Sequence, residues 1–437
     1  MTASHPRQSD WTRREFVATT AAVAGAAALS GLVIPRASGA TGRGAGRLKV
    51  GVIGCGGRGT GAAVNALEAS PDVELIALGD LFPDRIEGCK NELKQLSTDM
   101  QERCKTAMTN TFTGVDAYKQ VIATPCDIVI LATAPGFRPI HFAAAVEAGK
   151  HVFMEKPVAT CPAGVRMVIE SAAKAKEKKL SVVAGTQRRH ESSYVDAIPR
   201  LHDGAIGKVV SMDVYWNQGG LWMNKRQPAW TDAEWQIRNW LYFTWLSGDH
   251  ICEQHVHNLD VAYWVMDALP VRVLAMGGRQ VRTSPDYGNI YDHFACQFEY
   301  ADGRSVTSYC RQIDGCSSRV EEIVHGAEGR ARLADPGVAE FTGKTNWKWS
   351  GQDKQRYTQE HRDLIASITN NGPYLNEGQR IAESTLMAIM GRMSAYTGKT
   401  VTWEQAMNSK LDLVPREFAL GPLATPEIAV PGKTKLV

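Results

Sequence analysis

The stretch LKVGVIGCGGRGTGAAVNALEAS, residues 48–70, joins an apolar strand pattern to a glycine-rich turn and then to a helical pattern. Its glycines have the GxGxxG spacing, and they lie between strand and helix as a dinucleotide-binding turn requires. Glycine allows a tight turn and a close approach of the backbone to a pyrophosphate, which the free N–H groups of the helix N-terminus can bind. We therefore expect cofactor contacts from Gly54, Gly56, Gly57, Arg58 and Gly59.

Asp80 ends the next apolar pattern, VELIALGD at residues 73–80, and lies 21 positions after Gly59. An acidic residue at this distance accepts hydrogen bonds from the ribose hydroxyls and repels a 2′-phosphate. The pattern favours NAD as the cofactor, with NADP as the alternative. In a purely structural interpretation, Asp80 would be a loop residue or the cap of the following helix.

Further strand patterns indicate the fold class. CDIVILAT at 126–133 and HVFME at 151–155 alternate with helical patterns, which predicts a parallel sheet. Four later patterns have no long helices between them and favour an antiparallel sheet, at residues 208–216, 271–281, 291–300 and 304–312. We expect an α/β protein with an N-terminal Rossmann parallel-sheet domain over 47–170 and a C-terminal α/β substrate-binding domain with an open, mostly antiparallel sheet over 171–425.

The first forty residues differ in composition from the rest of the chain. The segment TRREFVATTAAVAGAAALSGLVIPRASGA, residues 12–40, begins with Arg13 and Arg14, continues through an alanine-rich apolar run and ends in small residues. This pattern predicts a twin-arginine export signal over residues 1–40. A membrane-spanning helix is the alternative, but the run is short for a span of about 20 strongly apolar residues. We expect a periplasmic or otherwise exported protein that uses the twin-arginine machinery and has no stable membrane insertion.

Composition limits the classes of partner. The 437 residues suggest about two domains. Basic and acidic residues number 49 and 46, and removal of the signal leaves 45 and 44, so no nucleic-acid partner is indicated. The nine cysteines are an odd number without the paired spacing of metal sites, so at least one is free. An oxidising compartment would permit a bridge between Cys89 and Cys104.

A polar cluster, GDHICEQHVHNLD at residues 248–260, has three interpretations. In the first, a helix begins near Asp249, and its step of about 100° per residue brings His250, Glu253 and His257 to one face. The acid and His257 would then be close enough to hydrogen-bond. A metal site would need His-x-x-Glu-His or His-Glu-x-x-His spacing, and neither occurs. The third interpretation is a helix start capped by Asp249 with solvated histidines. We favour the first and expect no metal.

HVFMEKP at 151–157, followed by a helix and by SVVAGTQRRH at 181–190, resembles the Gfo/Idh/MocA oxidoreductase family. Three motifs in order carry the resemblance: the GxGxxG turn, Glu155-Lys156-Pro157, and the segment 248–260. Members of that family, which include glucose–fructose oxidoreductase and inositol dehydrogenases, join a Rossmann domain to an α/β domain with an open sheet and have the active site between them. The resemblance implies the same architecture here, and a homo-oligomer formed through the free face of the sheet.

The resemblance also implies the catalytic residues. The family has a histidine at the position of His257 and usually an Asp at the position of Glu253, so Glu253 is either the partner of the histidine or a ligand of a sugar hydroxyl. Oxidation of a hydroxyl needs a base, and histidine has the unperturbed pKa nearest to neutrality. A buried lysine can polarise the oxygen and stabilise a developing alkoxide. We predict that Lys156 and His257 handle the proton and that Glu253 orients the imidazole or the substrate.

The remaining site residues are assigned more broadly. Further cofactor contacts are expected from Thr133, Pro135, His141, Glu155, Lys156 and Gln187. Six of the eleven tryptophans lie between Trp216 and Trp245, where they form either a small core or a platform for sugar rings. The loop-like composition around Trp222 and Trp230 favours these two as substrate contacts. The other predicted substrate contacts are Arg188, His250 and Tyr291.

Two hypotheses for the activity follow. The first is an NAD(P)-dependent oxidoreductase that acts on a sugar or glycoside hydroxyl by hydride transfer with a tightly bound cofactor, because an exported enzyme cannot draw on free NAD. The second is an NAD-dependent glycoside hydrolase, as in relatives of the same superfamily. It would oxidise a hydroxyl, eliminate the aglycone, add water and reduce again, with Tyr291 or Glu253 as an additional acid or base.

Overall fold

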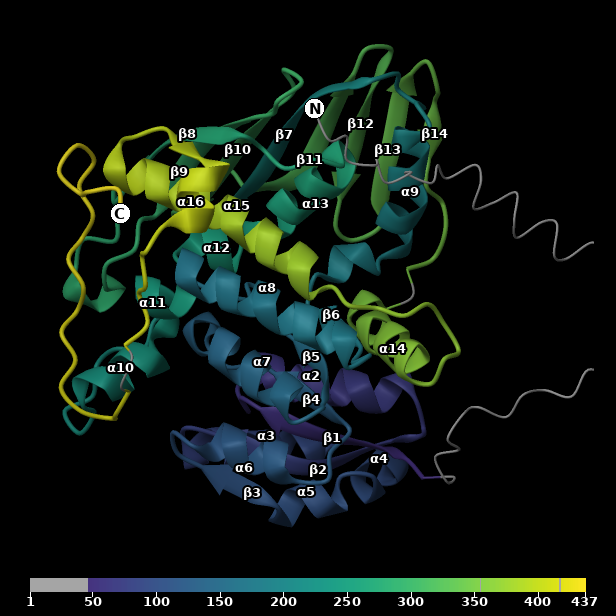
Figure 1. Ribbon diagram of the computed structural model, residues 1–437, viewed down its shortest axis with the longest axis vertical. Coiled ribbons are helices and arrows are strands. Elements are labelled where there is room, and N and C mark those ends of the chain that lie inside the picture. Colours follow the sequence, from purple (N-terminus) through teal and green to yellow (C-terminus); the bar gives the residue numbers. More distant parts are fainter. Residues whose placement is uncertain (1–45, 354, 416–417) are drawn as a thin grey trace, which may run out of the picture. The chain divides into compact units, whose positions relative to one another are not determined.

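Six apolar strands pair side by side into a parallel sheet in the computed structural model, which describes residues 46–353, 355–415 and 418–437 (Figure 1). In their order across the sheet the strands are β3 (Thr111–Thr113), β2 (Val73–Asp80), β1 (Leu48–Ile53), β4 (Ile128–Leu131), β5 (His151–Met154) and β6 (Val182–Ala184). This order confirms the predicted Rossmann sheet. The predicted export signal, residues 1–40, lies outside the described residues.

The strands of this sheet are buried because helices cover both faces, as is usual for parallel sheets. All four residues of β4 are buried, and in β1 only Lys49 is partly exposed. The helices that accompany the sheet are α2 (Gly57–Ala69), α3 (Pro83–Leu93), α4 (Thr98–Glu102), α5 (Lys105–Thr109), α6 (Ala117–Ala123), α7 (Arg138–Glu147) and α8 (Pro162–Glu177). Because the strands are parallel, their carboxyl ends and the loops that follow them share one edge, where ligands bind in such sheets.

A nine-stranded sheet forms the second part of the fold. In their order across it the strands are β14 (Trp347–Lys348), β13 (Val338–Gly343), β12 (Gly329–Ala334), β11 (Arg319–Gly326), β7 (Val209–Gln218), β10 (Ser305–Gln312), β9 (His293–Glu299), β8 (Arg272–Gly278) and β15 (Val401–Thr402). Only β7 and β10 pair in parallel, and the other described neighbours are antiparallel. The predicted mostly antiparallel sheet is confirmed.

Burial alternates along the strands of this second sheet. On β8, Val273 and Ala275 are buried, whereas Leu274 and Met276 are exposed, so one face packs and the other is open. Helices α13 and α15 pack on the buried face. The helices that follow β6 in the chain are α9 (Ser192–His202), α10 (Asp232–Arg238), α11 (Thr244–Ser247), α12 (His250–Glu253), α13 (Val256–Met266), α14 (Arg356–Ile368), α15 (Gly378–Thr397) and α16 (Trp403–Asn408). Of these, α14 packs against α2 of the Rossmann part. None of the described helices is both long and apolar enough to span a bilayer.

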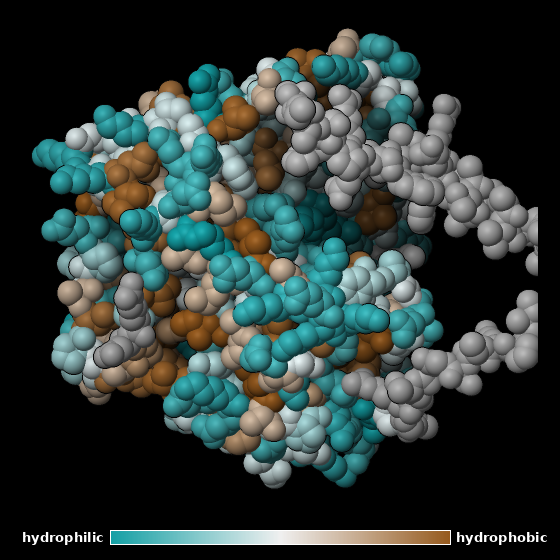
Figure 2. Space-filling model, in the orientation of Figure 1, coloured by the Kyte–Doolittle hydropathy of each residue, from teal (hydrophilic) through white to brown (hydrophobic). Residues whose placement is uncertain are grey.

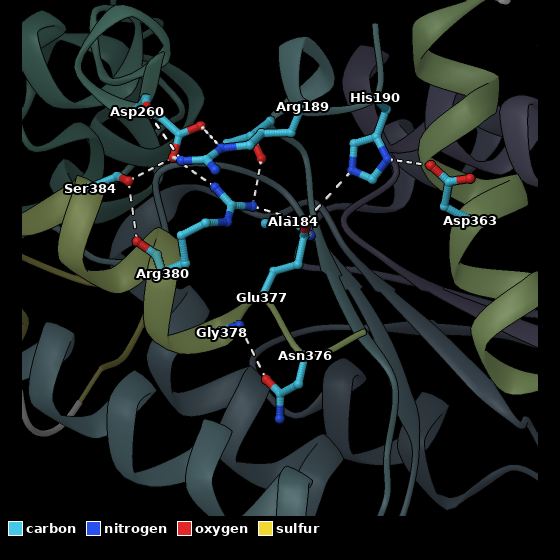
Figure 3. Close-up of polar contacts among 11 residues, drawn as sticks. Ala184, Arg189, His190, Asp260, Asp363, Asn376, Glu377, Gly378, Arg380 and Ser384 are labelled. Carbon is cyan, nitrogen blue, oxygen red and sulfur yellow. Dashed lines mark hydrogen bonds and ion pairs between the residues drawn. The ribbon is translucent and has the colours of Figure 1, made fainter. Parts of the chain in front are cut away.

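A buried ion cluster joins α13 to α15 and to the segment that follows β6 (Figure 3). Asp260, on α13, is almost fully buried, and its Oδ2 accepts a hydrogen bond of 2.9 Å from Nε of Arg189. Its Oδ1 accepts bonds of 2.6 Å from Arg380 and 2.7 Å from the hydroxyl of Ser384, both on α15. One carboxylate therefore joins the segment after β6 to two helices of the second part of the fold.

A second set of contacts extends the cluster to α14 (Figure 3). His190 Nδ1 lies 2.6 Å from Asp363 on α14, and its Nε2 lies 3.8 Å from Glu377. Glu377 in turn accepts a bond of 2.8 Å from the backbone N–H of Ala184 in β6. Burial alone would lower the pKa of His190, but the two carboxylates outweigh burial and raise it to about 10. The imidazole is therefore protonated at neutral pH and acts as a cationic bridge.

Asp260→Asn should destabilise the protein by about 3 kcal/mol, because loss of one partner leaves two buried guanidinium groups without their carboxylate. The free energy of unfolding from urea titration measures this change. Asp302→Asn is the matched control, since Asp302 pairs with Arg304 at the surface. The control should leave the urea midpoint unchanged. Equal midpoints for the wild type and Asp260→Asn would contradict the role of the cluster.

Candidate functional site

The glycine-rich turn joins β1 to α2 in the way its sequence predicts. Gly54 has a φ of +97°, and a Cβ on it would lie 2.6 Å from the backbone of Ala132. A Cβ on Gly59 would lie 1.7 Å from the carbonyl oxygen of Gly54, so only glycine lets the helix pack this closely on the strand. No atom lies within 4 Å of the positions that a Cβ would take on Gly56 or Gly57, and both residues border open space.

Asp80, at the end of β2, faces this turn. Its Oδ2 accepts a hydrogen bond of 2.7 Å from the backbone N–H of Cys55, and its Oδ1 accepts one of 2.9 Å from that of Phe82. Burial raises the pKa of Asp80, and the two N–H donors oppose this effect. The bonds fix the carboxylate beside the turn, where a dinucleotide would present its ribose hydroxyls.

A cavity of about 800 Å³ lies along this edge of the parallel sheet. Its volume is in the range of about 300–1,000 Å³ that is usual for cofactor and small-molecule sites. The predicted cofactor contacts that line it are Gly54, Gly56, Gly57, Arg58, Asp80, Thr133 and His141. The described lining does not include the other predicted contacts, which are Gly59, Pro135, Glu155, Lys156 and Gln187.

His141 stands in the wall of the cavity. Its ring stacks on that of Tyr118 with 4.3 Å between the centroids, and its Nδ1 lies 3.2 Å from the hydroxyl of Thr133. Burial, with a smaller effect of the neighbouring Arg138, lowers the pKa of His141 to about 3. The side chain is therefore neutral, and it can donate or accept a hydrogen bond at this wall.

Arg58 connects the cavity to the predicted catalytic lysine. It lines the cavity, and its Nε donates a bond of 2.6 Å to Glu155. The next residue, Lys156, is partly buried, and its Nζ donates a bond of 2.5 Å to the backbone carbonyl of Glu253. Burial lowers the pKa of Lys156, whereas the carboxylates of Glu253 and Glu155 oppose the decrease. Lys156 thus lies between the nucleotide edge of the first sheet and α12.

The segment 248–260 differs from the predicted single helix. It forms α12 and α13, which are interrupted at Gln254 because the N–H groups of both Gln254 and His255 point at the carbonyl of His250. This wider turn shifts the phase of the helix by one residue. The described contacts include no hydrogen bond between Glu253 and His257, so the predicted direct pairing of these two side chains is wrong. Lys156 instead interacts electrostatically with both of them.

Asp249 begins α12 in a strained conformation, with φ 72° and ψ 163°. Such a conformation costs on the order of 1–3 kcal/mol for a residue other than glycine. The carboxylate is fully buried and accepts bonds from the N–H of His250, the N–H of Tyr291 and the hydroxyl of Tyr396. Asp249 therefore caps the helix, as the third interpretation of this segment predicted. The histidines that follow are buried rather than solvated, which contradicts the rest of that alternative.

Several buried polar atoms around Lys156 have no hydrogen-bond partner among the described residues. They include Glu253 Oε1, His257 Nδ1, His250 Nε2 and Gln312 Nε2. Unpaired buried groups are rare and costly, and they mark places where a ligand or water completes the bonding. Burial raises the pKa of Glu253, opposed by Lys156, and burial lowers the pKa of His257 well below its usual value. His257 is therefore a neutral imidazole.

The sequence of these two regions matches two models of one family. Residues 48–184 match the oxidoreductase family model with an NAD-binding Rossmann fold, and residues 194–332 match the GFO/IDH/MocA C-terminal domain. The chain belongs to the GFO/IDH/MocA oxidoreductase family. The cradle of glycines, the helix N-terminus and Asp80 fit the NAD that binds to Rossmann domains of this family.

Relatives support the family at moderate similarity. The chain is 24% identical over 335 residues to an inositol 2-dehydrogenase/D-chiro-inositol 3-dehydrogenase of Lactiplantibacillus plantarum, which covers 74% of this chain and 83% of the relative. Its fold resembles aldose-aldose oxidoreductase from Caulobacter crescentus with a TM-score of 0.63 and 19% identity, over 82% of this chain and 99% of that one. It also resembles a levoglucosan dehydrogenase in complex with NADH and levoglucosan, with a TM-score of 0.64, 16% identity and the same coverage.

Within the family fold, Gln187 and Arg188 lie behind the site. Arg188 is fully buried and pairs with Glu322 at 2.6 Å, while its guanidinium carbon lies 5.4 Å from the ring centroid of Trp216. Trp216 in turn stacks on His257 with 5.7 Å between the centroids. Gln187 donates a bond of 3.3 Å to Asp335. The structure therefore gives Arg188 a supporting position for the Trp216–His257 stack.

The other predicted substrate residues do not form one cluster. Trp222 borders the nucleotide cavity, and Trp230 packs near Arg238 with 5.2 Å between the guanidinium carbon and the ring centroid. Tyr291 is buried, and its hydroxyl already donates a bond of 2.9 Å to the carbonyl of Ala429. Of this group, His250 alone lies beside Glu253, with Nε2 unpaired.

The sequence missed two residues beside Glu253. Gln312, on β10, and Arg282, which bonds to Gln312, both interact with Glu253, but no local motif marks either residue.

The nine cysteines all lie among the described residues and are free thiols, so the permitted bridge between Cys89 and Cys104 is absent. The described residues contain no group of three or more His, Cys, Asp or Glu that could hold a metal ion.

Gly56→Val should weaken NAD binding on the order of tenfold or more, because the side chain enters the space that the pyrophosphate approaches. Isothermal titration of the nucleotide-free protein with NAD measures the affinity. Gly61→Val is the matched control, since Gly61 lies in α2, the helix that Gly56 precedes, and outside the cavity lining. If the two variants bind NAD equally well, the turn is not the pyrophosphate site.

Proposed function

We propose that this protein is an exported NAD-dependent oxidoreductase that oxidises or reduces a hydroxyl-bearing carbon of a sugar or glycoside and keeps its cofactor bound. The observation that carries the proposal is the cluster of unpaired buried polar atoms around Lys156, next to the edge of the Rossmann sheet. A polyhydroxylated substrate offers the donors and acceptors that such a cluster lacks. The inositol and sugar dehydrogenases among the relatives favour the same substrate class.

In this proposal, His257 and Lys156 have different roles in removing the proton of the substrate hydroxyl. NAD, held by the glycine-rich turn and Asp80, would supply the acceptor for a hydride from the carbinol carbon. The hydroxyl proton must leave at the same time, and neutral His257 is poised to accept it at an unpaired ring nitrogen. Lys156 is held at 2.5 Å from the carbonyl of Glu253, from which its ammonium can stabilise negative charge on the substrate oxygen.

Glu253 and His250 fit a role in holding the substrate. Burial raises the pKa of Glu253, and its unpaired Oε1 can accept a hydrogen bond from a second hydroxyl. Asp249 Oδ1 lies 3.1 Å from His250 Nδ1, which fixes the ring and leaves Nε2 free for another substrate group. Glu253 is thus a ligand of substrate in this proposal, since it forms no bond with His257.

Export by the twin-arginine route fits this function, because that route carries folded proteins. A nucleotide bound before export would be retained, and the electrons taken from one substrate would pass to a second carbonyl compound in the same site. The proposal of export rests on Arg13, Arg14 and the apolar run after them, within the first 45 residues, which lie outside the described part of the chain.

The protein recovered from the periplasmic fraction should lack residues 1–40 and release NAD or NADH when it is denatured, as mass spectrometry will show. Addition of sugars and cyclitols should reduce the bound cofactor. The absorbance at the reduced-nicotinamide band measures this reduction. Lys156→Ala and His257→Ala should each slow this reduction by about 10²–10⁴-fold. His202→Ala, a change on α9 away from the site, should have no effect.

Reduction at the wild-type rate in both Lys156→Ala and His257→Ala, with the cofactor still bound, would contradict the assignment. Release of an aglycone from a glycoside without lasting reduction would favour the glycoside hydrolase instead. Absence of nucleotide, combined with no binding of added NAD, would overturn the oxidoreductase itself.

We also propose a homo-oligomer formed through the open face of the nine-stranded sheet. Leu274, Met276 and Tyr309 are exposed there, and Met276 is 75% accessible. The register sets Met276 beside Ala295 and Ala295 beside Tyr309, so these side chains form one row. An apolar row of this kind on a sheet face is a common site of subunit contact.

Met276→Arg should dissociate the oligomer, because it places a charge in the apolar contact. Light scattering coupled to gel filtration gives the mass of the assembly. Met167→Arg, at an exposed methionine of α8, is the matched control and should leave the mass unchanged. A wild-type mass equal to one chain would end the proposal.

A further inference from the structure

The nucleotide cavity has a second wall that the Rossmann domain does not supply. Five lining residues come from the insert between β7 and α11, residues 219–243, and they are Trp222, Asn224, Ile237, Arg238 and Trp240. Three more come from the C-terminal tail, and they are Val414, Pro415 and Phe418. We call residues 219–243, 414–415 and 418–423 the cover. In Figure 1 the yellow tail runs past α11 toward α10.

The two parts of the cover are joined to each other. The N–H of Ala233 donates a bond of 3.0 Å to the carbonyl of Gly421, and the side chain of Gln236 donates one of 2.9 Å to the carbonyl of Leu423. Phe418 packs edge-on against Phe137, which follows β4 and also lines the cavity. Figure 2 shows hydrophobic residues reaching the surface on this side of the molecule, over α10 and the tail.

A third hydrophobic core, separate from the cores of the two sheets, lies partly in the cover and partly in the adjoining residues Trp245, Leu246 and Ile290. It is built on Trp235, Leu241, Tyr242, Phe243, Trp245, Leu246 and Ile290, with Trp230, Trp240 and Phe418 packed around them. Most of the clustered tryptophans therefore stabilise the cover. A wall with its own core keeps its shape and does not collapse into the cavity.

One ion pair fastens the cover to the Rossmann domain. The guanidinium of Arg238, at the end of α10, donates two bonds of 2.9 and 2.8 Å to the two carboxylate oxygens of Asp84. Its carbon lies 3.9 Å from the ring centroid of Phe82. The Asp84 carboxylate has a pKa below its usual value because of its hydrogen bonds to Arg238. Bidentate geometry makes this pair stronger than an ordinary surface ion pair.

The loop that Arg238 binds through Asp84 also contains Asp80, the residue expected to bind the ribose. Phe82 donates its N–H to Asp80, so Asp80, Phe82 and Asp84 form one rigid turn. Both this turn and the cover line the cavity. A nucleotide that occupied the cavity would be enclosed between them, with its adenosine half beside Asp80.

We propose that the cover is a retaining wall for the adenosine diphosphate half of the cofactor, and that the Arg238–Asp84 pair is the latch that must open before the nucleotide can leave. This inference rests on the proposed function, because it explains how the cofactor stays bound through repeated turnovers. Arg238 acts through Asp84 and Phe82 and is a positioning residue.

The test measures exchange of the cofactor and needs no substrate. The mature protein is loaded with NAD, and entry of radiolabelled NAD into the protein is followed by rapid filtration. Arg238→Gln and Asp84→Asn should each speed exchange about tenfold, because each removes the bidentate pair. Arg200→Gln is the matched control, since Arg200 pairs with Asp196 on the exposed face of α9. It should exchange at the wild-type rate.

The charge-swapped double variant, Arg238→Glu with Asp84→Arg, should bring exchange back toward the wild-type rate, which a general loss of folding would not do. Asp84 lies at the exposed start of α3, so Asp84→Asn keeps the test open if Arg238→Gln fails to fold. Exchange at the wild-type rate in Asp84→Asn would overturn the latch, as would an equal increase in the Arg200 control. Failure of every form to bind NAD at all would instead overturn the proposed function.

Discussion

The buried carboxylate of Asp260 is the constraint on which the arrangement of this protein depends. It accepts hydrogen bonds from Arg189, which follows the last strand of the Rossmann sheet, and from Arg380 and Ser384 on α15. His257 lies about one turn earlier on α13, so this cluster holds the helix that carries the imidazole. A buried charge tolerates little displacement, since each lost bond exposes an uncompensated ion.

The ion cluster and the site differ in how completely their polar groups are satisfied. Asp260 has partners for both carboxylate oxygens, whereas Glu253, His250 and His257 each retain a buried atom without a partner. The strain at Asp249 adds to this cost. The stable cluster beside the site thus compensates for an arrangement of unpaired groups that a ligand or water would complete.

The sequence was sufficient where a structural role depends on neighbours in the chain. Gly54, Gly59 and Asp80 could be assigned because the turn, the helix and the strand end follow one another within about one βαβ unit. The alternation along the later strands likewise predicted the second sheet. Both predictions rest on residue periods and spacings that can be recognised within a short stretch of sequence.

The sequence was insufficient where distant segments meet. The break at Gln254 depends on a hydrogen-bonding choice at the carbonyl of His250, and the helical period does not reveal it. Arg238 and Asp84 lie 154 positions apart, and nothing in either neighbourhood marks the other as its partner. Arg188 looked like a substrate ligand beside the strand of SVVAG, but Glu322, on β11, draws it into the interior. Such pairings are set by tertiary packing, which leaves no local pattern.

The tryptophan cluster was interpreted either as a small core or as a binding platform, and the structure shows that a core and a cavity wall occur together in it. Trp235 and Trp245 form the core of the cover, and Trp222 and Trp240 face the cavity that this core supports. A wall of this kind is complete only when the last part of the chain has packed on α10, because Gly421 and Leu423 supply its bonds. Closure of the nucleotide cavity is therefore tied to the folding of the whole chain.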